Sequence, residues 1–231
     1  LVTPARHVPL GVVMSPARRR ALLDWASRSG AWILEDDYDS ELQYAARPPA
    51  PLHALDTAGS VLLAGTFSKV LFPALRLGYL VVPPALADAA AAAKRFADIA
   101  SPYLEQAVLA EFIADGHFER HIRRMREVYQ RRQDLLVTLL EQRLGPGVDV
   151  VASGSGLNLL VWLPKGVDDE RVAREGSASG VELMPLSRFR AGPAPGARGG
   201  LVLGYGGIRE RDLADGVDRL ARLPALSAGA R

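Results

Sequence analysis

The sequence contains no cysteine and no long apolar run. Without cysteine the chain can form neither a disulfide framework nor a cysteine-ligated metal site, which excludes the small secreted folds that depend on disulfides. No stretch of eighteen apolar residues is free of charge and proline, so no membrane span is expected, and the first residues do not resemble a signal peptide. These absences favour a protein of the reducing cytoplasm.

The sequence also lacks a strong charge of either sign. The formal net charge is only +2 over 231 residues, which gives little electrostatic reason to expect a nucleic-acid partner. Hydrophobic residues make up 48% of the chain and charged residues 23%, a balance that can bury a substantial core. Composition therefore predicts a folded protein that acts on a small molecule.

Lysine is scarce as well. The chain has three lysines, Lys69, Lys94 and Lys165, against twenty-five arginines. Lysine can lose its proton and form an imine with a carbonyl group, whereas arginine stays protonated. Lys69 ends the run Thr66–Lys69, directly after an apolar segment, and is therefore the candidate nucleophile.

Apolar runs and helical periodicity alternate along the first half of the chain. Ser15 and Pro16 are typical of a helix start, and Gly30 is typical of its end. Short apolar runs predict buried strands at 31–34, 61–64 and 77–82, the first of them stopping at the carboxylates. Helices are expected over 85–100, 102–115 and 117–143. This order predicts an α/β layer architecture.

The second half has the pattern of a small α+β domain. Strands are expected at 148–151, 157–163, 181–184 and 201–203, helices at 168–179 and 210–223, and a mobile loop over 191–200. The long helix would join a large domain over 1–120 to a small domain over 121–231. Its arginine run favours a solvated helix face, with a nucleic-acid patch as the alternative.

An acidic cluster, Glu35–Asp39, follows the first expected strand. If the strand continues through the cluster, Asp36 and Tyr38 share one face and the other acidic side chains share the opposite face. Ligands of open α/β sheets bind beyond the carboxyl ends of strands, where Lys69 is also expected. Two alternatives remain: a polar loop that caps the strand, and a divalent-metal site.

Three motifs together resemble the fold-type I pyridoxal-phosphate enzymes. They are Glu35–Glu41, Gly65–Lys69 and Pro73–Tyr79, with Asp36 and Lys69 thirty-three residues apart. The sequence is most similar to the aminotransferase-like domain of MocR-type regulators in the GntR family. The resemblance implies a fold-type I transferase architecture, namely part of a large domain with a mixed, mainly parallel sheet, followed by a small α+β domain.

The resemblance also implies roles for single residues. Lys69 would form the Schiff base with pyridoxal 5'-phosphate and shuttle the substrate proton. Asp36 would pair with the pyridine nitrogen, and Tyr38 would contact the phenolic oxygen of the cofactor. The cofactor phosphate would be held by Arg76, Thr66 and Ser68. The substrate carboxylate would be gripped by Arg188, although two more arginines lie nearby, Arg190 and Arg198.

The function that the resemblance implies is the sensing of an amino acid, an amine or pyridoxal phosphate itself by a transcription regulator. The alternatives are a stand-alone aminotransferase, which moves an amino group from an amino acid to a 2-oxo acid, and an α/β domain without a cofactor. The resemblance further implies a chain truncated at its N-terminus, a homodimer, and DNA contact only through a module absent from this chain.

Overall fold

The computed structural model describes residues 1–44, 50–99, 102–192, 194 and 196–227. The chain divides into two compact units. The first unit comprises Leu1–His7 and Val12–Met125, and the second comprises Val8–Gly11 and Arg126–Arg231. The division falls inside a long helix, α5 (His117–Leu144). Each unit is described by itself below.

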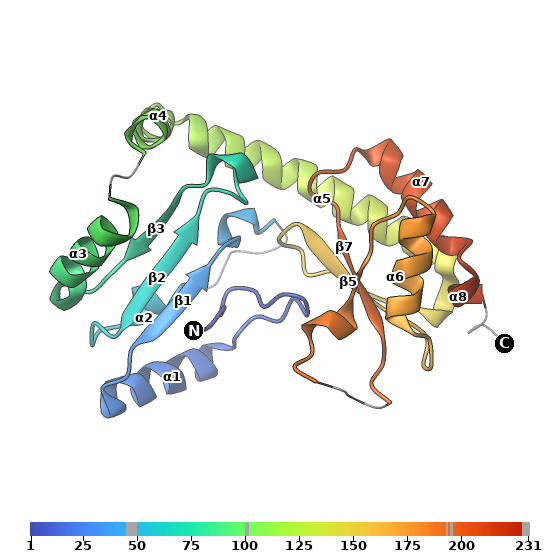
Figure 1. Cartoon of the computed structure of the whole chain (residues 1–231), viewed down its shortest axis with the longest axis horizontal. Coiled ribbons are helices and arrows are strands. Elements are labelled where there is room, and N and C mark those ends of the chain that lie inside the picture. Colours follow the sequence, from blue (N-terminus) through green and yellow to red (C-terminus); the bar gives the residue numbers. More distant parts are fainter. Residues whose placement is uncertain (45–49, 100–101, 193, 195, 228–231) are drawn as a thin grey trace. The chain divides into compact units, whose positions relative to one another are not determined.

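The first unit is built on a three-stranded sheet in the order β1-β2-β3 (Figure 1). Its strands are β1 (Ile33–Asp37), β2 (Val61–Thr66) and β3 (Gly78–Val81). Strands β1 and β2 are parallel and β2 and β3 antiparallel, while Val2 adds a parallel bridge to Glu35. The expected α/β class with a mixed sheet is confirmed.

The first helix begins and ends at the residues that the sequence indicates, whereas the helix expected over 85–100 is shorter and the helix over 52–55 was not expected. In α1 (Pro16–Ser29) the Ser15 hydroxyl accepts a hydrogen bond from the Arg18 amide, and Gly30 takes the left-handed conformation that ends the helix. The further helices are α2 (Leu52–Leu55), α3 (Ala87–Asp98), α4 (Tyr103–Ala114) and the start of α5. The core between α1, α2 and the sheet contains Ala26, Ile33, Leu52 and Val61. Of the helix expected over 85–100, residue 100 lies outside the described residues.

Two expectations about the first strand were wrong. The strand does not stop at Leu34, because its ladder with β2 continues to the pair Asp37 and Gly65. The condition that it continues through Asp39 is not met either, since it ends at Asp37 and Tyr38 and Asp39 lie between it and a 3₁₀ turn over Ser40–Leu42. The carboxylates therefore lie partly on the strand and partly on the turn after it.

The second unit is an α+β arrangement around an antiparallel sheet in the order β4-β5-β7-β6, of which Figure 1 labels β5 and β7. Its strands are β4 (Asp149–Val151), β5 (Asn158–Trp162), β6 (Met184–Pro185) and β7 (Gly200–Gly204). Its helices after α5 are α6 (Asp169–Ala178), α7 (Glu210–Ala221) and α8 (Pro224–Ser227).

One strand of the second unit is displaced from its expected position. The apolar residues at 181–184 predicted a strand there, but β6 begins only at Met184, where pairing with Val202 starts. Residues 193 and 195 of the expected loop over 191–200 lie outside the described residues, and the described residues from 191 to 199 form neither helix nor strand. In the part of the chain that the structure describes, no helix is long and apolar enough to cross a membrane.

Candidate functional site

The carboxyl ends of β1 and β2 lie next to each other and carry the candidate residues. Because the two strands are parallel and Asp36 pairs with Ala64, the segments that follow them leave the same edge of the sheet. Burial raises the pKa of Asp39, in the turn after β1, and the charge of Lys69, in the turn after β2, is one of the weaker effects that oppose this rise. The two turns are thus close enough to interact electrostatically.

Two of the acidic side chains hold backbone in place. The buried Glu35 carboxylate accepts hydrogen bonds of 2.9 Å from the amides of Leu52 and His53, at the start of α2. The Asp37 carboxylate accepts bonds from the amide and the hydroxyl of Ser40, which closes the turn after β1. Glu35 and Asp37 therefore have the structural role expected of a polar segment that caps the strand.

Asp36 differs from its neighbours. Side chains alternate along a strand, so Asp36 points to the face opposite the one on which Glu35 meets α2. Its half-buried carboxylate accepts no hydrogen bond and forms no ion pair with any residue that the structure describes. Burial, followed by the nearby charge of Asp37, raises the pKa of Asp36. A carboxylate in this state is suited to a cationic partner.

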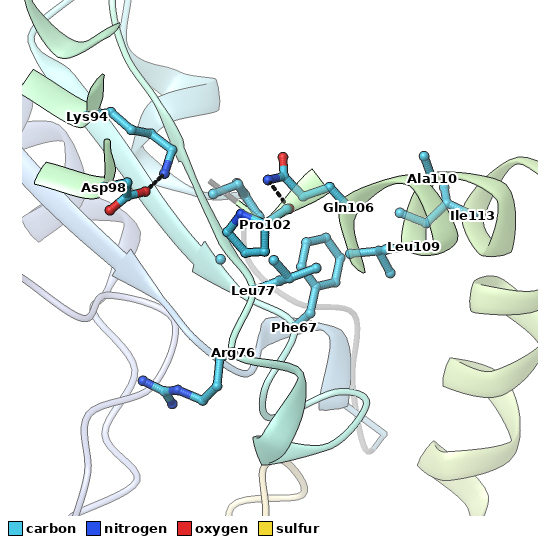
Figure 2. Close-up of a pocket in the computed structure, with 12 residues that line it drawn as sticks. Phe67, Arg76, Leu77, Lys94, Asp98, Pro102, Gln106, Leu109, Ala110 and Ile113 are labelled. Atoms are coloured by element: carbon cyan, nitrogen blue, oxygen red, sulfur yellow. Dashed lines mark hydrogen bonds and ion pairs between the residues drawn. The ribbon is translucent and has the colours of Figure 1, made fainter. Parts of the chain in front are cut away.

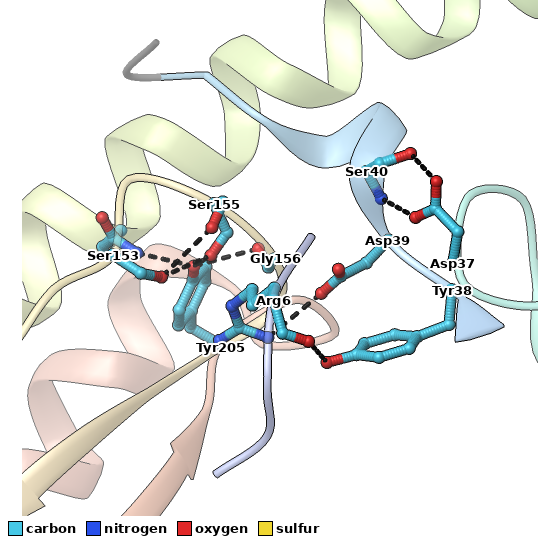
Figure 3. Close-up of polar contacts among 10 residues, drawn as sticks. Arg6, Asp37, Tyr38, Asp39, Ser40, Ser153, Ser155, Gly156 and Tyr205 are labelled. Atoms are coloured by element: carbon cyan, nitrogen blue, oxygen red, sulfur yellow. Dashed lines mark hydrogen bonds and ion pairs between the residues drawn. The ribbon is translucent and has the colours of Figure 1, made fainter. Parts of the chain in front are cut away.

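Tyr38 and Asp39 are both held by Arg6, as Figure 3 shows. The Tyr38 hydroxyl donates a hydrogen bond of 2.8 Å to the Arg6 carbonyl oxygen, and the Arg6 guanidinium pairs with the buried Asp39 carboxylate at 3.0 Å. Burial, with a further contribution from Asp39, raises the pKa of Tyr38 to about 12. Burial also raises the pKa of Asp39 to about 6, which outweighs the opposing effect of Arg6.

The turn that carries Lys69 is closed by Thr66. The Thr66 hydroxyl accepts a hydrogen bond of 3.1 Å from the Ser68 amide and donates a longer one of 3.4 Å to the Leu77 carbonyl oxygen. Lys69 is exposed, and neither its amine nor the Ser68 hydroxyl bonds to another described residue. Thr66 therefore shapes the turn, whereas Ser68 and Lys69 are available to a ligand.

Arg76 lies in an unusual backbone conformation. Its φ of 52° and ψ of 28° place a non-glycine residue in the left-handed region, at the end of the 3₁₀ turn Pro73–Leu75. It lines a pocket of about 370 Å³, and Figure 2 shows its guanidinium directed away from the apolar side chains of Phe67 and Leu109. Strain of this kind is often found at functional sites.

Tyr79 is a neighbour of the site that the sequence did not reveal. A Cβ atom on Gly65 would lie 2.2 Å from the Tyr79 ring, so a side chain at this position would require the ring to shift. Tyr79 also contacts Phe67, with ring centroids 5.6 Å apart. No spacing rule pairs Gly65 with Tyr79, because the contact depends on the antiparallel register of β2 and β3.

In the second unit the three candidate arginines differ in their bonding. Arg190 donates to the Arg198 carbonyl oxygen at 2.6 Å, and Arg198 donates to the Leu163 carbonyl oxygen and pairs with Asp149. Arg188, in the 3₁₀ turn Leu186–Phe189, is exposed and bonds to no described residue. Of the three, Arg188 is the one whose guanidinium is available to an anionic ligand.

The second unit also contains a buried hydrogen-bond network, drawn in part in Figure 3. Tyr205 is fully buried; its hydroxyl accepts a bond from the Gln133 side-chain amide and donates to the Gly156 carbonyl oxygen. Gln133 in turn accepts a bond from the Gly154 amide. This network anchors the segment before β5 to α5, and no sequence motif indicates it.

The free groups of the first unit suit pyridoxal phosphate. The unpartnered Asp36 carboxylate could pair with a protonated ring nitrogen, and the free Lys69 amine could bind an aldehyde. The Ser68 hydroxyl and the Arg76 guanidinium could bind a phosphate. Among the residues that the structure describes, no three His, Asp or Glu side chains gather in a way that could hold a metal ion.

Comparison with known proteins agrees with this chemistry. The family model for aminotransferase class I and II matches residues 1–191. The chain is 40% identical to the probable rhizopine catabolism regulatory protein MocR of Rhizobium meliloti, across 99% of this chain and 46% of that protein. It is 30% identical to aromatic-amino-acid aminotransferase 1 of Thermococcus litoralis, across 94% of this chain and 52% of that protein. The chain thus spans about half the length of the curated relatives it matches.

A solved structure gives the same result. Pyrococcus horikoshii kynurenine aminotransferase, crystallised with PMP, has a TM-score of 0.87 and 30% identity over the whole of this chain and 56% of that one. This likeness confirms the expected fold class, that of fold-type I pyridoxal-phosphate-dependent transferases, and with it pyridoxal phosphate as the cofactor of the fold. The chain belongs to the aminotransferase class I and II family.

Proposed function

We propose that this chain is the pyridoxal-phosphate-binding, aminotransferase-like domain of a MocR-type transcription regulator of the GntR family. The observation that carries the proposal is the half-buried Asp36 carboxylate, which has no partner among the described residues and lies at the same sheet edge as the free Lys69. The boundary between the large and small domains of the family would lie within α5.

Each residue has a role that its surroundings support. Lys69 would hold the cofactor by its aldehyde, because its amine is the nucleophile available at this edge of the sheet. Asp36 would hold a proton on the ring nitrogen. Ser68 and Arg76 would bind the phosphate. When bound, pyridoxal phosphate supplies a carbonyl that exchanges with amines and a ring that accepts electrons.

Three predicted residues have roles that are less direct. Thr66 would act on the phosphate mainly by shaping the turn, because its hydroxyl proton is directed to Leu77. The Tyr38 hydroxyl would accept a hydrogen bond from the cofactor. To donate one to the cofactor, it would first have to break its hydrogen bond to the Arg6 carbonyl oxygen. Arg188 would bind the carboxylate of an amino acid, a role that fits its free guanidinium.

The assignment to a regulator is supported by the similarity to MocR of Rhizobium meliloti. The ligand that is sensed would be an amino acid, an amine or pyridoxal phosphate itself. DNA would be contacted through another part of a longer protein, and the working form would be a cytoplasmic homodimer, as is common for this fold.

A stand-alone aminotransferase is the second candidate. The observation that favours it is the 30% identity to the aromatic-amino-acid aminotransferase of Thermococcus litoralis. Both candidates use the same cofactor chemistry, and they differ in whether an amino group leaves the protein on a 2-oxo acid.

The two candidates are separated by following the absorbance of the chain mixed with pyridoxal phosphate while amino acids and 2-oxo acids are added. A band near ~420 nm is expected for the lysine-linked cofactor. Turnover of many equivalents of 2-oxo acid per chain would favour the aminotransferase, and a spectral change limited to one equivalent would favour the sensor. A Lys69→Ala variant that keeps the band would refute both.

A further inference from the structure

Helix α5 contacts the turn that carries Lys69 at both ends of that turn, Phe67 and Val70. The His121 Nε2 atom lies 2.9 Å from the carbonyl oxygen of Val70, the residue directly after Lys69. One turn earlier on the helix, the Phe118 ring meets the Phe67 ring edge-on, with centroids 5.9 Å apart. The turn from 67 to 70 is thus fixed from the outside at two points.

The contact with Val70 defines the state of the His121 ring. A carbonyl oxygen can only accept a hydrogen bond, so Nε2 must carry a proton. Both the neutral Nε2–H tautomer and the imidazolium ion meet this requirement. In either form the ring donates this hydrogen bond to the backbone of Val70.

The two α5 contacts hold opposite ends of the same turn. Phe118 and His121 are three residues apart, so they lie on the same face of the helix. Within the turn, the Leu71 amide donates a bond of 2.9 Å to the Phe67 carbonyl oxygen. The side chain of Lys69 is exposed and has no described bonding partner, so its direction depends on the backbone that carries it.

We propose that His121 is a positioning residue for Lys69. By donating to the Val70 carbonyl oxygen it fixes the turn so that the Lys69 amine is presented to the cofactor aldehyde at the edge of the sheet. This inference rests on the proposed function, and it adds a residue from a helix distant in sequence to the residues that define the site.

The test compares variants that keep or remove the donor. His121→Met removes it, and His121→Gln restores an N–H group on a side chain of similar length. His117→Met is the matched control, because His117 lies one turn earlier on α5, is exposed and contacts Arg120 and Phe112 instead of the lysine turn. Each variant is mixed with pyridoxal phosphate, reduced with borohydride and mapped by mass spectrometry.

The readout is the ratio of adduct on Lys69 to adduct on the exposed Lys165, which serves as an internal standard. His121→Met should lower this ratio about fivefold, the change expected from losing one hydrogen bond of ordinary strength. His121→Gln should restore most of it, and His117→Met should leave it unchanged. An unchanged ratio in His121→Met, or a loss in His121→Gln equal to that in His121→Met, would overturn the proposal.

Two further measurements do not depend on the cofactor. Amide hydrogen exchange in the peptide over 67–71 should be faster in His121→Met than in His117→Met. Equal exchange in the two variants would contradict the role of His121. If wild-type Lys69 formed no adduct, that result would count against the proposed function alone. If His121→Met fails to fold, nitrogen NMR of the wild-type ring decides. A neutral Nδ1–H tautomer of His121 would exclude the bond to Val70.

Discussion

At the scale of single residues, neighbouring carboxylates on one strand have different tasks. Asp36 lacks a bonding partner among the described residues, whereas Asp37 holds the turn at Ser40. Asp36→Asn should weaken pyridoxal phosphate binding roughly 10- to 100-fold, the range for losing a charge-assisted hydrogen bond. The dissociation constant is measured by absorbance titration.

The matched control for this prediction is Asp37→Asn. It should lower the free energy of unfolding by loosening the turn, while its effect on cofactor affinity stays small. Equal losses of affinity in the two variants would show that the acidic cluster acts only through the general charge of the site.

The buried Arg6–Asp39 pair predicts a pH dependence of stability. The pKa of Asp39 is raised from 3.8 to about 6 in the folded chain, so the folded chain holds this proton more tightly than the unfolded chain. The contribution of this proton to the free energy of unfolding is fully present below pH 3.8 and is lost as the pH rises through about 6. Its size is on the order of 2–3 kcal/mol.

The variant Asp39→Asn removes this titration. Urea unfolding at a series of pH values from 4 to 7 should show the wild type losing stability relative to Asp39→Asn over that window. Asp24→Asn, at an exposed position on α1, is the control and should run parallel to the wild type. Parallel curves for Asp39→Asn and the wild type would refute the raised pKa.

At the scale of elements, helix α2 depends on a carboxylate from β1. This helix has only four residues, and the buried Glu35 accepts bonds from its first two amides. Glu35→Gln turns one acceptor oxygen into a donor that faces an amide N–H, so unfolding should require about 1–3 kcal/mol less. The exposed Glu119→Gln on α5 should change the free energy of unfolding little in the same urea titration.

The pairing of β2 and β3 depends on the absence of a side chain at Gly65. In Gly65→Ala the new methyl group would overlap the Tyr79 ring, with a cost of about 1–3 kcal/mol. Gly204→Ala, at the end of β7, has no atom within 4 Å of the new group and is the control. Thermal unfolding checks both variants, and equal midpoints would show that Tyr79 moves aside freely.

Local signals predicted the elements well, and contacts between elements were less predictable. Ser15, Pro16 and Gly30 define α1 correctly because capping depends on adjacent residues. The extent of β1 was misjudged because carboxylates weaken a strand signal, whereas pairing with β2 and Val2 stabilises this strand from both sides.

Within the candidate site, too, residues in local motifs could be predicted, whereas residues that make distant contacts could not. Asp36 and Lys69 could be singled out from motifs, since their spacing resembles that of a known family. Arg6 and His121 could not, because each contacts a residue far away in the sequence. The structure was also needed to distinguish Arg188 from Arg190 and Arg198, because only bonding separates them.

At the scale of the whole molecule, a net charge of +2 gives the chain little attraction for nucleic acid. In about 150 mM salt it should bind duplex DNA no more tightly than about 1 µM, the range of non-specific contacts. Fluorescence anisotropy with a labelled duplex measures this affinity. Tighter, sequence-dependent binding would contradict the proposal that DNA is contacted through another part of a longer protein.

The most direct test of the central claim is the position of the covalent cofactor. The chain is incubated with pyridoxal phosphate, reduced with borohydride and digested, and the adducts on its three lysines are counted. Lys69 should carry nearly all of the adduct, and Asp36→Asn should lower its yield. An even distribution over Lys69, Lys94 and Lys165 would contradict a specific role for Lys69, because Lys69 would then react only as any exposed amine does.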